Sequence, residues 1–218
     1  MKKNLTELVF ILDRSGSMAG LESDTIGGFN SMLEKQKREP GRAYVTTVLF
    51  DNRWELLHDH WMIQEVEPMN EKQYYVRGCT ALLDAVGMTI QKLIRIQKNA
   101  GPSQKADQVI FVITTDGLEN ASREYSCSRV KEMIEYQKEK YGWEFLFLGA
   151  NMDAVKEASH LGIGADRAAS YVNDREGVQL NYEVVSKTVS SMRMGAAPVG
   201  SAWKAPIEKR NEERKRRK

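Results

Sequence analysis

The amino-acid sequence predicts an α/β protein with a doubly wound, mostly parallel sheet, one antiparallel edge strand and helices on both faces of the sheet. Short apolar runs rich in β-branched and aromatic residues recur along the chain. Longer segments, in which an apolar residue returns every three or four positions, separate these runs. Buried parallel strands joined by helices produce this alternation, because helices cover both faces of such a sheet.

Five apolar runs are the expected strands. Four of them read as buried parallel strands: Leu8–Leu12, Tyr44–Phe50, Val109–Thr114 and Phe145–Leu148. The fifth, Trp54–Trp61, follows the turn signal Asp51-Asn52, so we expect it to pair antiparallel with Tyr44–Phe50 and to form the edge of the sheet.

The segments between the strands are expected to be amphipathic helices. The first of them places Ile26, Phe29 and Leu33 on one face, at helical spacing. Glycines mark the ends of two helices, at Gly142 and Gly162. The expected helices are Asp24–Lys37, Ala81–Gln97, Ser128–Tyr141, Asp153–Leu161 and Val178–Met194.

Composition and charge favour one domain over residues 1–195. The chain has 218 residues, of which 41% are hydrophobic, and a formal net charge of +2. That balance does not indicate a nucleic-acid or membrane-surface protein, and no apolar run approaches the roughly 20 residues of a membrane helix. The two cysteines have no CxxC spacing, which favours a reducing compartment. We therefore expect a cytoplasmic protein that does not interact with a membrane.

Residues 196–218 differ in character from the rest. From Lys204 onward the chain has eight Lys or Arg and three Glu residues, with few apolar residues among them. Such a segment buries too little apolar surface to offset the entropy of ordering it, so we expect a disordered basic tail. Any nucleic-acid binding by this tail would be unspecific and sensitive to salt.

Polar residues follow two of the expected strands and precede the second long helix. Asp13, Ser15 and Ser17 form a DxSxS pattern directly after the first strand, Thr80 precedes the helix, and Asp116 follows the strand Val109–Thr114. In an open parallel sheet, ligands bind beyond the carboxyl ends of the strands. Carboxylate and hydroxyl oxygens suit Mg²⁺, Mn²⁺ or Ca²⁺.

In order and spacing, these five residues resemble the metal-ion-dependent adhesion site (MIDAS) of von Willebrand factor A (vWA) domains, in particular the free-standing type of bacteria and phages. The resemblance covers roughly residues 8–194. It implies a Rossmann-like doubly wound fold and a non-enzymatic adaptor. It further implies that Ser15, Ser17 and Thr80 bind the cation directly or through water, that Asp13 and Asp116 act largely through water, and that an acidic residue of a partner protein completes the site.

The types of these residues give that partner role a physical reason. Neutral hydroxyls next to Mg²⁺, with carboxylates behind them, leave the cation with unneutralised charge, and this charge attracts an external carboxylate. We expect residues on the flanking loops to recognise the partner: Arg14, Met18, Glu119 and Asn120.

An alternative is a Mg²⁺-dependent phosphoryl hydrolase with Asp13 as the nucleophile. An aspartate at the end of a first strand also occurs in haloacid-dehalogenase-type phosphotransferases, which carry a second aspartate two residues later as the acid/base. Here Ser15 occupies that position. The sequence therefore favours the adaptor.

Overall fold

The computed structural model describes residues 5–150, 152–195 and 200–216, and these residues form a six-stranded sheet in the order β3-β2-β1-β4-β5-β6. β2 and β3 are antiparallel, and the other neighbours are parallel. The predicted fold class, including its antiparallel edge, is confirmed. The strands are β1 Leu5–Asp13, β2 Arg42–Phe50, β3 Trp54–Met62, β4 Gln108–Thr115, β5 Glu144–Ala150 and β6 Ala168–Tyr171.

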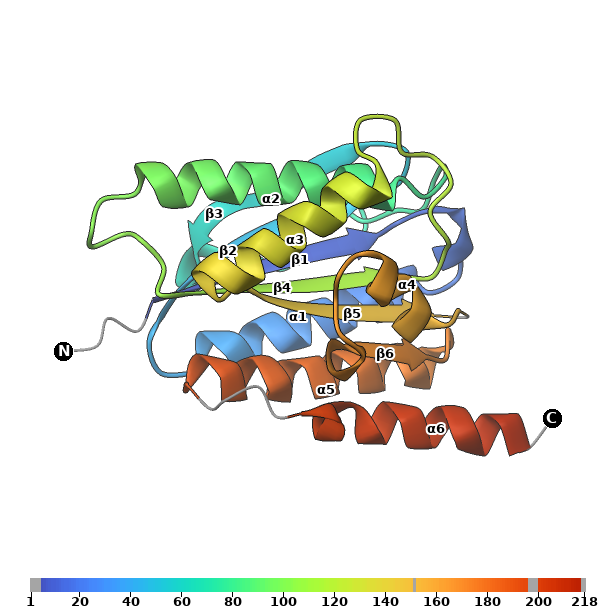
Figure 1. Ribbon diagram of the computed structural model, residues 1–218. Coiled ribbons are helices and arrows are strands. Elements are labelled where there is room, and N and C mark those ends of the chain that lie inside the picture. Colours follow the sequence, from blue (N-terminus) through green and yellow to red (C-terminus); the bar gives the residue numbers. More distant parts are fainter. Residues whose placement is uncertain (1–4, 151, 196–199, 217–218) are drawn as a thin grey trace.

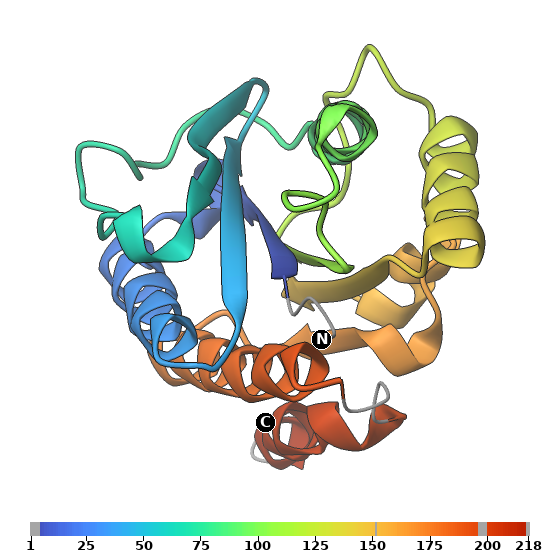
Figure 2. The same ribbon diagram turned by 90° about the vertical axis from the view of Figure 1, so that its left-hand side faces the viewer.

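Helices cover both faces of the sheet (Figures 1 and 2). In β1 the side chains alternate between the faces: Leu8 and Phe10 join the core under α1 and α5, and Val9 and Ile11 join the core under α2 and α3. Both faces of β1 are therefore buried. The helices are α1 Glu22–Lys37, α2 Leu82–Asn99, α3 Cys127–Tyr141, α4 Ala154–His160, α5 Arg175–Arg193 and α6 Ala205–Arg216.

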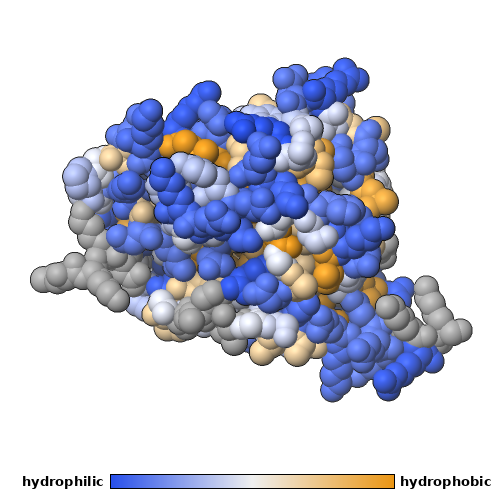
Figure 3. Space-filling view, viewed as in Figure 1, coloured by the Kyte–Doolittle hydropathy of each residue, from blue (hydrophilic) through white to orange (hydrophobic). Residues whose placement is uncertain are grey.

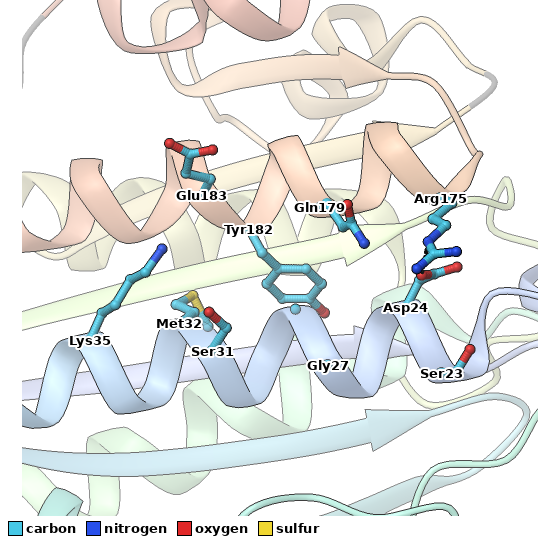
Figure 4. A pocket seen from close by; sticks show the side chains of 11 residues that line it. Ser23, Asp24, Gly27, Ser31, Met32, Lys35, Arg175, Gln179, Tyr182 and Glu183 are labelled. Atoms are coloured by element: carbon cyan, nitrogen blue, oxygen red, sulfur yellow. Dashed lines mark ion pairs between the residues drawn. The ribbon is translucent and has the colours of Figure 1, made fainter.

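α1 and α5 lie side by side, and Tyr182 of α5 extends toward α1 (Figure 4). A Cβ atom at Gly28 would lie only 2.3 Å from Cδ2 of Tyr182, so this position of α1 has room only for glycine. An ion pair of 3.5 Å between Arg175 and Asp24 joins the two helices near their N-termini. The close approach of α1 and α5 therefore depends on glycine, which has no side chain, at position 28.

The C-terminal segment differs from the expected loose tail. α6 packs against α5 and β6, with Ile207 only 2% exposed and Trp203 partly buried. The Arg210 guanidinium forms an ion pair of 2.7 Å with Asp174. The physical reason is that Trp203 and Ile207, one helical turn apart, bury enough apolar surface to dock a helix whose other faces are charged. Residues 196–199 and 217–218 of the expected tail lie outside the described residues.

The face of the molecule seen in Figure 3, in the same view as Figure 1, is mostly hydrophilic. The projecting end of α6 is strongly hydrophilic. Among the described residues, none of the helices combines the length and the apolar character that crossing a membrane requires.

Candidate metal centre

The five predicted metal residues come together at the carboxyl end of β1 and β4. These strands are parallel neighbours, with Leu12 opposite Thr114, so Asp13 at the end of β1 and Asp116 just after β4 emerge at the same edge of the sheet. β2 lies on one side of β1 and β4 on the other. The order in which strands are added to the sheet therefore reverses between β1 and β4, and doubly wound folds bind their ligands at such a point.

Asp13 is held firmly by its neighbours. Its Oδ1 accepts a hydrogen bond of 2.7 Å from the Ser15 backbone N–H, and its Oδ2 accepts one of 2.6 Å from the Thr115 hydroxyl. Tyr74 donates its hydroxyl proton to the Asp13 carbonyl over 2.6 Å. Burial raises the pKa of the Asp13 carboxyl above its usual value, and the hydrogen bonds from Thr115 and Ser15 oppose that rise.

Asp116 faces the serine loop. Its Oδ1 accepts a hydrogen bond from Ser17 Oγ, which lies 3.0 Å from Ser15 Oγ, and its Oδ2 accepts a bond of 2.9 Å from Asn173 Nδ2. Burial raises the pKa of Asp116 to about 6, and the negative charge of Asp13 adds to the rise. The charge of Asp13 thus disfavours the charged form of Asp116, and a bound cation would stabilise both carboxylates.

Thr80 lies on a loop that hydrogen bonds hold on both sides. The Thr80 N–H donates to Asn120 Oδ1 and the Asn120 N–H donates to the Thr80 carbonyl, each over 3.0 Å. Gly16 N–H donates to the Gly78 carbonyl over 3.2 Å and joins the loop to the serine motif. Gly78 has a φ of +69°, a conformation that a glycine adopts without strain.

Gly117 leaves the space at the centre of the site open. A Cβ atom there would lie 2.7 Å from Thr80 Oγ1 and 3.5 Å from Ser17 Oγ. The hydroxyls of two candidate ligands therefore face the same point, which a side chain would fill. A donor set of hydroxyl and carboxylate oxygens around such a space fits a hard divalent cation.

This set of metal donors differs from a site built from three or more His, Cys, Asp or Glu side chains. Among the described residues, no group of three or more His, Cys, Asp or Glu side chains is placed to hold a metal ion. The candidate centre instead combines the two carboxylates with three hydroxyls, those of Ser15, Ser17 and Thr80.

Two of the four residues expected to recognise a partner are buried in the structure. Arg14 is 0% exposed, with its Nε 3.1 Å from Asp51 Oδ2, and Met18 is 5% exposed. Neither side chain offers surface to a partner, because β1 directs Arg14 inward to a carboxylate at the end of β2. This departs from the expectation for both residues.

The other two expected residues brace the loops. Glu119 accepts hydrogen bonds from the backbone N–H groups of Leu83 and Ser122, at 2.8 Å and 2.7 Å, so its carboxylate is directed into the fold. Asn120 is exposed, although its side-chain oxygen is bonded to Thr80. Leu118, which is 57% exposed beside Gly117, is a surface residue that the sequence analysis did not select.

Three residues that support the aspartates were also missed: Thr115, Tyr74 and Asn173. The position of Thr115, next to Asp116 at the end of an expected strand, was a usable signal. Tyr74 and Asn173 lie in irregular segments far along the chain from Asp13 and Asp116, and no local pattern marks them.

No family model and no curated protein matches this sequence, but solved structures match the fold. The von Willebrand factor domain of the type V pilus tip protein Mfa5 from Porphyromonas gingivalis matches with a TM-score of 0.61 and 10% identity, over 88% of this chain and 96% of that one. The fold is that of a vWA domain. VWA2 of Sulfolobus acidocaldarius, an ArnB paralogue, matches with a TM-score of 0.50 and 18% identity, over 87% of this chain and 45% of that one.

A third structure of the vWA fold carries a metal. Proximal thread matrix protein 1 of the mussel byssus, with zinc in its MIDAS motif, matches with a TM-score of 0.58 and 13% identity. The match covers 85% of this chain and 46% of the mussel protein, so this chain spans less than half of its length. At these identities the comparisons establish the fold alone.

Proposed function

We propose that this vWA domain is a protein-interaction module that holds a divalent cation and uses it to capture an acidic side chain of a partner protein. Asp13, Ser15, Ser17, Thr80 and Asp116 hold the cation, which is Mg²⁺, or Mn²⁺ or Ca²⁺ in its place. The observation that carries the proposal is the convergence of Ser17 and Thr80 hydroxyls on the space left by Gly117, with the Asp116 carboxylate beside it. The zinc-occupied MIDAS of the mussel protein supports a divalent site in this fold.

The charges around the site favour capture of a carboxylate. Both Asp13 oxygens already accept hydrogen bonds from the protein, which favours contact with the cation through water. A cation bound mainly by hydroxyls and water keeps charge that an external carboxylate neutralises. The partner therefore presents an Asp or Glu side chain.

The surface next to the centre gives the partner a second contact. An apolar cavity of about 210 Å³ borders Gly117 and Leu118 and extends to Leu82 and Met152. Leu118 and Asn120 are the exposed residues among the four that directly follow Asp116. We assign recognition of the partner to these two residues and not to Arg14 or Met18, because the latter are buried.

The arrangement of Asp13 does not favour the phosphoryl hydrolase. A carboxylate nucleophile must be reached by its substrate, but Asp13 is only 2% exposed and each of its oxygens accepts a hydrogen bond from the protein. Ser15 occupies the position where that reaction needs an acid/base carboxyl. We therefore propose a binding role without catalysis.

We also propose that the protein acts in the cytoplasm. Cys79 and Cys127 are both free and exposed, and exposed thiols of this kind persist in a reducing compartment.

A metal titration tests the cation site. We expect Mg²⁺ at about 100 times its dissociation constant to stabilise the wild type by about 2.7 kcal/mol. This metal-dependent rise in Tm should vanish in Asp13→Asn and Asp116→Asn. It should persist in Asp59→Asn, which changes an exposed carboxylate on β3. A rise of equal size in all four proteins would place the metal elsewhere.

A peptide selection tests the carboxylate capture. Random peptides displayed on phage are bound to the immobilised protein in Mg²⁺ and released with a chelator. We expect every enriched peptide to contain an Asp or Glu, and replacing that residue by Asn or Gln should abolish binding. Chelator-released peptides that bind equally well without any acidic residue would overturn the mechanism.

A further inference from the structure

A second cleft lies between α2 and α3, at the opposite end of the sheet from the candidate metal centre. Its walls include Val109 near the start of β4 and Trp143 just before β5, and its volume is about 990 Å³. Small-molecule sites have volumes of roughly 300–1,000 Å³. The cleft is therefore large enough for a ligand of its own.

Aromatic rings give the cleft flat apolar surfaces. Trp143 is 6% exposed and stacks on Phe111, with ring centroids 5.6 Å apart and planes 22° apart, so its indole is fixed in place. Tyr136 and Tyr141, near the end of α3, are 49% and 52% exposed. Their rings meet edge to face, with planes 67° apart, so a flat ligand can stack on one of them at a time.

The rim of the cleft carries an excess of positive charge. Its charged residues are Lys98, Lys105, Arg129, Lys140, Asp107 and Glu132. Arg129 is paired with Glu132 at 3.3 Å, whereas Lys98 and Lys105 have no ion pair with any residue that the structure describes. The two free ammonium groups attract an anion.

A buried amide on the cleft wall lacks an acceptor. The side-chain oxygen of Gln97 accepts a hydrogen bond of 3.1 Å from the Ala106 N–H, and this bond fixes the orientation of the amide. Its Nε2 has no hydrogen-bond partner within the described part of the chain, and the residue is 9% exposed. A buried donor without an acceptor costs free energy, because it has given up its hydrogen bond to water. A ligand acceptor that reaches Gln97 after a small shift of the wall would recover this cost.

We propose that this cleft binds a small anionic molecule with a flat aromatic ring, and that a nucleotide is the class of ligand it takes. The base lies beside Trp143 and stacks on one of the exposed tyrosines, with Gln97 available to a ring acceptor. The phosphate groups lie at the rim beside Lys98 and Lys105. This site is independent of the cation, because it lies at the other end of the sheet.

Calorimetry with ADP in the presence of a chelator tests the proposal, because the chelator removes any cation through which ADP could reach the metal centre. We expect ADP to bind, and adenosine and pyrophosphate each to bind at least tenfold more weakly, since each lacks one half of the ligand. No binding of ADP, or pyrophosphate binding as tightly as ADP, would overturn the proposal. Binding of an eight-nucleotide RNA in the absence of ADP binding would overturn it too.

Amino-acid substitutions test whether ADP binds in this cleft. The double substitution Lys98→Glu with Lys105→Glu reverses exposed charges and should weaken ADP binding at least tenfold. The control Lys131→Glu lies on α3 outside the cleft and should leave the affinity unchanged. ADP should also shift the indole N–H resonance of Trp143, identified by its loss in Trp143→Phe. Unchanged ADP affinity in the double variant, or an unshifted Trp143 resonance, would exclude this cleft.

Discussion

Arg14 lies inside the candidate metal motif, yet its guanidinium supports the fold. Asp51, which is 0% exposed, receives both Arg14 at 3.1 Å and Arg77 at 2.6 Å. These ion pairs hold the serine loop against the end of β2 and against the segment that leads to Thr80. Electrostatic contacts of the buried Arg14 thus help to set the positions of the hydroxyl groups of the site.

We expect Arg14→Ala to lower the free energy of unfolding by about 3–5 kcal/mol, because it leaves the buried Asp51 carboxylate with one fewer partner. Arg53→Ala, at an exposed arginine of the same turn, should change it by less than about 0.5 kcal/mol. Urea unfolding followed by circular dichroism measures both. An Arg14 variant as stable as the wild type would mean that the buried pair contributes nothing net.

In the proposed cation site, Asp116 should make cation binding depend on pH. Its pKa is raised to about 6, mainly by burial, and a cation must displace the proton. We therefore expect Mg²⁺ affinity to be constant well above pH 6 and to fall below it, by up to about tenfold per pH unit. Calorimetric titrations at pH 7.5, 6.0 and 5.0 measure this. Equal affinities at all three values would show that Asp116 has no part in binding the cation.

At the scale of single residues, the sequence predicted the positions that belong to a local motif. The DxSxS pattern, Thr80 and Asp116 could be found because each follows a strand or precedes a helix. The inward orientation of Arg14 could not be found, because it depends on Asp51, a contact between separate strands that no spacing reveals. Whether the residues of the flanking loops are exposed or buried also depends on long-range contacts, so the sequence did not predict it.

Among the elements, the long helices and the central strands were predictable and two peripheral elements were not. β6 has only four residues, Ala168–Tyr171, and the first three have small side chains, so the segment gives no marked apolar run. α6 has a charged sequence in which Ile207 alone is deeply buried among its apolar residues. Both depend on packing against the rest of the molecule more than on their own sequence.

The docking of α6 predicts a stability effect outside the expected domain boundary. Ile207→Ala should lower the free energy of unfolding by about 2–3 kcal/mol, because the lost methyl groups leave a cavity under the helix. Lys209→Ala, at an exposed position of the same helix, is the control and should have an effect near zero. Thermal unfolding measures both, and equal Tm values for the two variants would mean that α6 is not docked in solution.

Adjacent glycines in α1 offer a matched pair of substitutions. A Cβ at Gly28 would overlap the Tyr182 ring, whereas a Cβ at Gly27 meets nothing within 4 Å. Alanine is favoured over glycine in a helix by about 1 kcal/mol, but overpacking costs about 1–3 kcal/mol. We expect Gly27→Ala to raise the free energy of unfolding and Gly28→Ala to lower it. Chemical denaturation measures both changes in the free energy of unfolding. If both substitutions stabilised the protein, this would show that α5 moves aside easily.

The stability of the whole molecule in acid depends on two groups, His58 and Asp116, whose protonation acts in opposite directions. His58 on β3 is 3% exposed, stacks against Phe29 and has its Nδ1 2.9 Å from the Thr47 hydroxyl. Burial lowers the pKa of His58 from 6.5 to about 4. The folded state therefore keeps a neutral imidazole at pH values where the unfolded chain binds a proton.

Protonation of His58 thus favours unfolding, and its contribution is fully present above pH 6.5 and is lost as the pH falls toward 4. Asp116 acts in the opposite sense, because its raised pKa makes the folded state bind a proton first as the pH falls through about 6. The curve for the wild type alone cannot separate the two groups. The difference between the wild type and His58→Gln can, since Asp116 is common to both.

We expect the stability advantage of the wild type over His58→Gln to shrink by on the order of 1–3 kcal/mol between pH 7 and pH 4.5. Urea unfolding across that range, with chelator present to keep cations from Asp116, gives the difference directly. His160→Gln, at an exposed histidine, serves as the control for the loss of a histidine as such. A difference between wild type and His58→Gln that stays constant, or grows as the pH falls, would mean that His58 is protonated inside the folded protein, and the packing of β3 against α1 would then have to accommodate a charge.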